Sequence, residues 1–272
     1  MRCKNQRRST NKRARAAVTT TILGILAVSF TVLISMAGLV LVGRLTPLSV
    51  RQEHNNVAGF IYAVLGVAYG VALGFMLITV WQQYETARST ADQEANDLAT
   101  IYSLANQLPE SERRQVQQVV RSYAQTVIDE EWPMLQDGQL SPHAGKLLNE
   151  IQQDIENFEP NTYAEQVLYD REVSRVHNLA DNRRLRLSEA NAYIPTILWV
   201  VLLIGGVVTI SFAYLFGLER TRAHMLMVGA LSLVIASILF ATYSLDNPFA
   251  GDTRLQPDTL ESVLRGFEEN QQ

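Results

Sequence analysis

Four long segments without a formal charge divide the chain, at residues 21–43, 57–81, 194–217 and 225–243. A helix needs roughly 20 apolar residues to cross the hydrocarbon core of a bilayer, so each segment is long enough to span it. The acidic and basic residues lie between and outside these segments. The pattern predicts an all-α integral membrane protein with four transmembrane helices.

The second apolar segment is predicted to continue as a helix far beyond the membrane. Charged residues begin after Gln82, but neither proline nor glycine occurs before Pro109. Nothing local therefore ends the helix at the membrane surface, and we expect it to run from about 57 to 107. Its charged half keeps apolar side chains at helical spacing, which predicts packing on other helices: Ala91, Ala95, Leu98, Ile101, Tyr102 and Ala105.

The rest of segment 82–193 also has the pattern of helices, over about 110–132 and 142–158 and from about 162 onward. The last is expected to enter the third span, with a kink at Pro195. The predicted organisation is an arm (1–20), a transmembrane hairpin (21–81), a helical domain (82–193), a second transmembrane hairpin (194–244) and a tail (245–272) with a short amphipathic stretch at 258–269.

The distribution of basic residues predicts how the protein is oriented in the membrane. Seven basic residues and no acid precede the first span, namely Arg2, Lys4, Arg7, Arg8, Lys12, Arg13 and Arg15. Positively charged flanks stay in the cytoplasm, so we expect both termini and the 82–193 domain to be cytoplasmic, in a multi-pass protein of the inner (plasma) membrane. The net charge of −4 does not indicate a nucleic-acid surface. The single cysteine, Cys3, excludes an intramolecular disulfide.

Small residues recur on the second span, where Gly66, Gly70 and Gly74 follow one another at every fourth position. Such a stripe exposes the backbone and lets another helix approach closely. The partner helix can belong to the same subunit or to a neighbouring one, and the sequence does not choose between them.

One side of the second span is a candidate pore lining, since apolar and aromatic side chains can gate a pore by dewetting. Simple packing against other helices is the favoured alternative for this side, which carries Tyr62, Gly66, Tyr69, Leu73, Met76, Val80 and Gln83. The absence of charge inside every span argues against a proton-coupled transporter.

Two charged clusters have a structural and a functional interpretation. In Asp129-Glu130-Glu131-Trp132-Pro133 we favour a buried indole with solvent-facing acids over a cation or partner site. In Arg183-Arg184-Leu185-Arg186 we favour anchoring at lipid headgroups over attraction of anions to a pore mouth.

Sequence signatures of enzymes are absent: the chain has no nucleophile elbow, phosphate loop or nucleotide fingerprint. The four histidines are scattered, which predicts no metal site. We therefore expect neither catalysis nor a cofactor.

Several short motifs are spread along the chain: Trp81-x-x-Tyr84, Glu94-Ala95, Glu131-Trp132-Pro133, Arg183-Arg184-x-Arg186, Pro195-x-x-Leu198-Trp199 and Asp246-Asn247-Pro248-Phe249-x-Gly251. Together they resemble the bestrophin-like domain family of bacterial membrane proteins. The resemblance covers nearly all of the chain after the basic arm. It implies distant similarity to bestrophins, which are pentameric, calcium-activated chloride channels with four membrane segments per subunit and a pore lined by the second segment.

The chain departs from bestrophins in two places. Asp252 and Asp258 are the only acids that follow the Asn-Pro-Phe segment in its vicinity, where bestrophins have a calcium-binding acidic cluster, so calcium activation is not implied. Bestrophins also have closely spaced phenylalanines in the second segment, whereas Phe60 and Phe75 stand far apart.

The leading hypothesis is a homo-oligomeric channel in the lipid bilayer, permeable to inorganic anions. The alternative is a non-conducting scaffold or signalling adaptor that binds a partner through its cytoplasmic helices. The 19 acids and 10 bases of segment 82–193 support that alternative, because a simple pore does not need so large a domain.

Overall fold

The computed structural model describes the backbone of residues 2–251 and 253–269, and the side chains of residues 22–251 and 253–269. Helices and turns make up this part of the chain, with no strand, which confirms the all-α prediction. The side chains of the basic arm, Cys3 among them, and Asp252 lie outside the described residues. The chain forms two compact units: unit 1 comprises residues 1–82 and 193–246, and unit 2 comprises residues 83–192 and 247–272.

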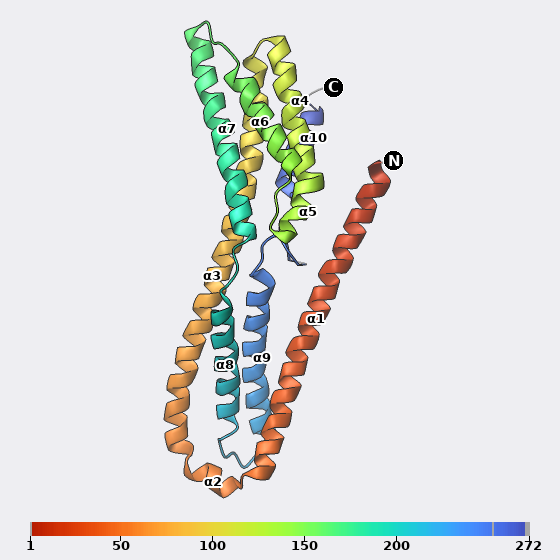
Figure 1. Ribbon diagram of the computed structural model, residues 1–272. Coiled ribbons are helices and arrows are strands. Elements are labelled where there is room, and N and C mark those ends of the chain that lie inside the picture. The colour runs from red at the N-terminus through yellow and green to blue at the C-terminus, as the bar shows by residue number, and fades with distance from the viewer. Residues whose placement is uncertain (1, 252, 270–272) are drawn as a thin grey trace. The chain divides into compact units, whose positions relative to one another are not determined.

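Within the described residues, four helices are long and apolar enough to cross a membrane, and their apolar parts belong to unit 1 (Figure 1). They are α1 (Arg2–Leu45), the first part of α3 (Asn55–Leu104), α8 (Thr196–Ala213) and α9 (Thr221–Leu245), and the short α2 (Leu48–Glu53) precedes α3. Helix α1 packs mainly along α9. The chain is therefore a membrane protein whose first span finds its main partner in the last one.

Glycines let these helices approach one another. A Cβ atom added at Gly24 of α1 would overlap the Phe240 ring of α9, and one added at Gly229 of α9 would lie 2.6 Å from Cε of Met36. Helices in a membrane associate by close packing, because lipid tails are as apolar as the side chains. The small residues thus determine where α1 and α9 meet.

Tyr69 fixes α3 against α8. Its ring lies against Gly205 and Gly206, where an added Cβ would be 2.6 Å and 2.9 Å from ring and hydroxyl atoms respectively. Its hydroxyl donates a 2.9 Å hydrogen bond to the carbonyl oxygen of Leu202. The paired glycines form the notch that accepts the ring.

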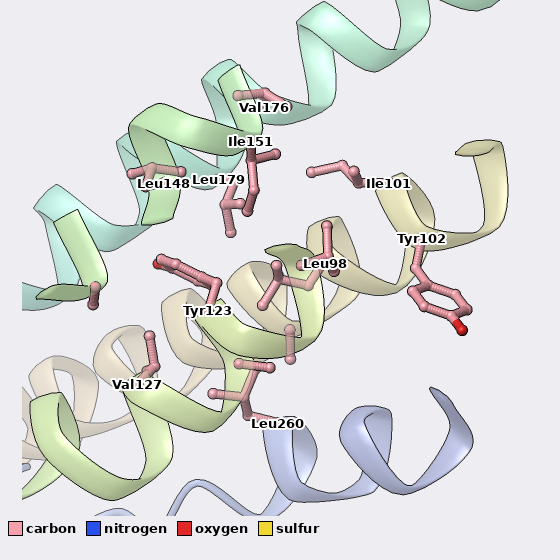
Figure 2. Close-up of a cluster of buried hydrophobic side chains, with 14 of the residues drawn as sticks. Leu98, Ile101, Tyr102, Tyr123, Val127, Leu148, Ile151, Val176, Leu179 and Leu260 are labelled. Atoms are coloured by element: carbon pink, nitrogen blue, oxygen red, sulfur yellow. The ribbon is translucent and has the colours of Figure 1, made fainter. Parts of the chain in front are cut away.

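Unit 2 is a helical bundle around one apolar core (Figure 2). Its elements are the second part of α3, η1 (Ala105–Gln107), α4 (Glu110–Thr126), the π-helical turn η2 (Val127–Glu131), α5 (Trp132–Met134), η3 (Leu135–Asp137), α6 (Pro142–Glu156), α7 (Tyr163–Ala190) and α10 (Asp258–Glu269). Figure 2 shows how α3, α4, α6 and α7 contribute side chains such as Leu98, Tyr123, Ile151 and Leu179 to the core.

Local signals set several helix ends in unit 2. The Ser141 hydroxyl accepts from the backbone N–H groups of His143 and Ala144 and so caps α6. Thr162 and Glu165 form a complete capping box at the start of α7. Gly138 ends η3 with a left-handed conformation (φ 65°), which glycine adopts without strain.

The expected kink at Pro195 is wrong, because α7 ends at Ala190 and α8 begins separately at Thr196. Asn191 is the C-cap residue of α7, and Pro195 is the N-cap residue of α8. A proline in a helix interior would remove a backbone hydrogen bond, whereas at a helix start it costs nothing.

The Tyr69 notch predicts the effect of enlarging Gly205. Gly205→Ala should lower the free energy of unfolding by about 1–3 kcal/mol, because the new methyl group overlaps the Tyr69 ring. Gly59→Ala is the matched control, since its added Cβ meets no atom nearer than 3.9 Å. Denaturant titration in mild detergent measures both. A Gly205→Ala cost that persists undiminished in a Tyr69→Ala background would contradict the contact.

Candidate functional site

The two sides of the α3 span have different surroundings. Tyr69, Leu73 and Val80 are buried within the chain, and Met76 packs on the cluster that Tyr69 and Leu73 form with α8 and α9. The Tyr62 ring stacks on Phe212 of α8, with 5.8 Å between centroids. This side of α3 is the one that the sequence proposed as a pore lining.

Tyr69, Leu73 and Val80 are at most 9% exposed in a single chain, so their side chains are covered by other parts of the same chain. Of the other candidates, Gly66 and Gln83 are half-buried. The hydrophobic pattern alone does not separate the inward side of the span from the outward one, because both sides of a membrane helix are apolar.

The opposite side of the span faces away from the chain. Six of the apolar side chains on this side are between 51% and 75% exposed: Phe60, Val64, Val67, Val71, Phe75 and Ile78. Beside them lies the stripe of Gly66, Gly70 and Gly74, where an added Cβ would meet no atom within 4 Å. The stripe is thus not used for packing inside one chain.

A buried charge cluster in unit 2 is centred on Arg186 of α7. Its guanidinium is fully buried, with Nε 3.0 Å from Oε2 of Glu94 and Nη2 2.5 Å from Oε1 of Glu131. The Tyr123 hydroxyl donates a 2.8 Å hydrogen bond to Oε1 of Glu94. Burial and the charge of Glu94 raise the pKa of Tyr123 well above its ordinary value, so the phenol remains a donor.

Arg183 adds a second cation to this cluster. Its Nε and Nη2 donate to the two carboxylate oxygens of Glu131 at 3.1 Å and 2.5 Å, and Nη2 also donates to the Ser141 carbonyl at 2.9 Å. The Ser141 backbone N–H donates to Glu131 as well, at 2.9 Å. Burial lowers the pKa of Arg183, but the hydrogen bond and charge of Glu131 outweigh it and raise the pKa overall.

Trp132 closes one side of the cluster. The Arg186 guanidinium carbon lies 5.2 Å from the centroid of the indole, within the range of a cation–π interaction. The indole Nε1 donates to the Leu255 carbonyl at 3.1 Å, and the ring meets Phe249 edge to face at 5.7 Å. Motif residues from the middle and the end of the sequence thus meet around one guanidinium.

Two side chains of the Asp246-Asn247-Pro248-Phe249 motif accept hydrogen bonds, one in each unit. In unit 1 the Asp246 carboxylate accepts from the Ile194 backbone N–H at 2.9 Å and from Nε1 of Trp199 at 3.3 Å. In unit 2 the Asn247 side-chain oxygen accepts from two backbone N–H groups, those of Phe249 and Ala250. Gly251 follows with a φ of 73°, a conformation that side chains disfavour.

Six of the motif residues are exposed: Trp81, Pro133, Arg184, Pro195, Leu198 and Gly251. Tyr84 is half-buried, and its hydroxyl donates to the Thr253 carbonyl at 3.1 Å.

The structure corrects both interpretations of the charged clusters. Trp132 is buried and Asp129 and Glu130 are exposed, as expected, but Glu131 is fully buried as the partner of two arginines. Headgroup anchoring is wrong for Arg186 and Arg183, because their guanidinium groups bind carboxylates inside unit 2. A π-helical turn ends at Glu131, and no sequence signal announced that turn or the participation of Tyr123 and Ser141.

The cluster is suited to fixing helices in place. It brings two carboxylates and two guanidinium groups together, so its formal charges cancel. Within the described residues no group of three or more His, Cys, Asp or Glu side chains could hold a metal ion. The arrangement joins α3, η2 and α7 through one shared guanidinium.

Comparisons with known proteins agree with this architecture. Residues 7–260 match the family model described as the bestrophin-like domain. The structure is similar to a single-substitution variant of a bacterial bestrophin homolog from Klebsiella pneumoniae, with a TM-score of 0.65 and 14% identity over 89% of this chain and 99% of that one. A second structure of the Klebsiella pneumoniae homolog, solved by zinc phasing, gives a TM-score of 0.63 and 14% identity over 88% of this chain and 97% of that one. A search of curated protein sequences gave no match.

The charge cluster predicts a large difference between two neighbouring arginines. Arg186→Met should lower the free energy of unfolding by about 3–5 kcal/mol, because Glu94 and Glu131 would remain buried without their shared cation. Arg184→Met, whose side chain is 75% exposed, should change it by less than about 0.5 kcal/mol. Denaturant titration in detergent measures both, and similar costs would contradict the role given to the cluster.

Proposed function

Because the chain belongs to the bestrophin-like domain family, we propose that it forms an oligomeric, anion-permeable channel. The observation that carries this proposal is the outward side of the α3 span, which is apolar, contains two phenylalanines and borders an open glycine stripe. One helix face does not enclose a pathway, so copies of the chain must supply the remaining walls.

In the proposed assembly the α3 spans surround a common axis. The stripe of Gly66, Gly70 and Gly74 allows a neighbouring helix to approach the backbone closely. The adjacent outward side, with Phe60 and Phe75, then faces the pathway. A cyclic ring of identical subunits satisfies both contacts at every interface.

Aromatic side chains support a preference for anions. The edge of a phenylalanine ring carries partial positive charge, so rings that present their edges to a narrow pathway can stabilise a poorly hydrated anion. The apolar residues between Phe60 and Phe75 offer no group that would bind a cation. Such a wall can also close by dewetting without any moving side chain.

The proposed orientation follows from the basic arm. In the proposed topology the N-terminus is cytoplasmic and the chain crosses the inner membrane four times. Unit 1 then lies in the inner membrane, and unit 2 lies in the cytoplasm. Unit 2 and the cytoplasmic mouth of the pathway then share one compartment.

Chloride flux from liposomes that contain the purified protein tests the proposal. Phe75→Ala should change the flux severalfold, because it removes a ring from the proposed pathway. Leu226→Ala is the matched control: its side chain on α9 is 73% exposed but lies on another helix, and flux should remain at the wild-type level.

Two results would contradict the channel. One is a protein that stays monomeric in lipid, since a single copy cannot surround a pathway. The other is a folded, oligomeric protein without flux of chloride or any other small anion. A partner that then co-purified with the full-length chain would favour the scaffold alternative.

A further inference from the structure

A carboxylate without a partner is buried in the core of unit 2. Glu172 lies on α7 one turn from Leu168 and one turn from Val176, which both belong to the apolar core. Its side chain is fully buried. Neither of its carboxylate oxygens has a hydrogen-bond partner in the described part of the chain.

Two acids on the neighbouring helices α3 and α6 have other partners. Asp97 of α3 binds Arg175 and also accepts from Asn182, both on α7. Asp154 of α6 accepts from Gln115.

Burial alone raises the pKa of Glu172 to about 7, and no neighbouring charge contributes to the shift. Near neutral pH the group is therefore divided between a neutral acid, which the core tolerates, and a carboxylate, which it does not.

We propose that the protonation state of Glu172 controls how α7 packs in unit 2. The protonated side chain keeps α7 in the bundle, and the ionised side chain favours its release. An ionised carboxylate in this core gains solvation only if α7 moves away from α6 and α3. Helix α7 also carries Arg183 and Arg186. Release of α7 would thus open the charge cluster as well, so one proton influences the packing of the whole unit.

The direction of the pH effect follows from the two pKa values. Glutamate has an ordinary pKa of 4.5, which applies when the segment is open, and the folded value is raised to about 7. The closed state therefore holds the proton more tightly. Its stability is complete below pH 4.5, falls as the pH rises from 4.5 to 7, and is constant above 7.

Hydrogen exchange of the full-length protein in lipid nanodiscs tests whether the packing of α7 depends on the protonation of Glu172. After correction for intrinsic exchange, protection of α6 and α7 peptides in the wild type should fall by up to about tenfold per pH unit between pH 5 and 7. Glu172→Gln keeps the shape of the side chain but does not titrate, and should remove this dependence. Glu156→Gln, an exposed position on α6, is the matched control and should behave as the wild type.

A second variant keeps the test decisive if the amide disturbs the core. Glu172→Leu replaces the acid with an apolar side chain and should give pH-independent protection that exceeds the wild-type level at pH 7. Wild-type protection that does not vary with pH would overturn the proposal. So would an unchanged pH profile in both Glu172 variants. Neither outcome depends on whether the protein conducts ions.

Discussion

A guanidinium held between two carboxylates, in an interior that water does not reach, is the constraint on which unit 2 depends. Arg186 meets Glu94 and Glu131 from positions far apart in the chain, and Trp132 covers it. Buried ion pairs add little net stability compared with apolar packing, but each missing partner leaves a costly uncompensated charge. The elements α3, η2 and α7 must therefore be placed together, and the loop at Ser141 is placed with them through Arg183.

Local signals made much of the fold predictable. Four charge-free segments gave the four spans, and helical spacing past Gln82 gave the continuation of α3. The Ser141-Pro142 pair marked the start of α6, and the amphipathic stretch at 258–269 became α10. Each of these signals acts over a few residues, so the sequence alone contains it.

The candidate site was less predictable because its geometry depends on distant partners. The π-helical turn that ends at Glu131 has no sequence signature of its own, and it directs both Glu131 and Trp132 inward. The burial of Arg183 and Arg186 required knowledge of which acids would face them. The hydrophobic pattern did not distinguish the two sides of the α3 span, because lipid and protein interior are equally apolar. Tyr69, with its hydrogen bond to Leu202, lies on the inward side.

The pairing of α1 with α9 affects how the protein is made. The ribosome completes α1 long before it reaches residue 221, the first of α9. At the usual rate of synthesis, roughly 5–20 residues per second, the first span waits in the lipid on the order of ten seconds without its main partner. During that interval its glycines, Gly24 among them, are uncovered. The contact surface of α1 is thus complete before the surface that it packs against has been made.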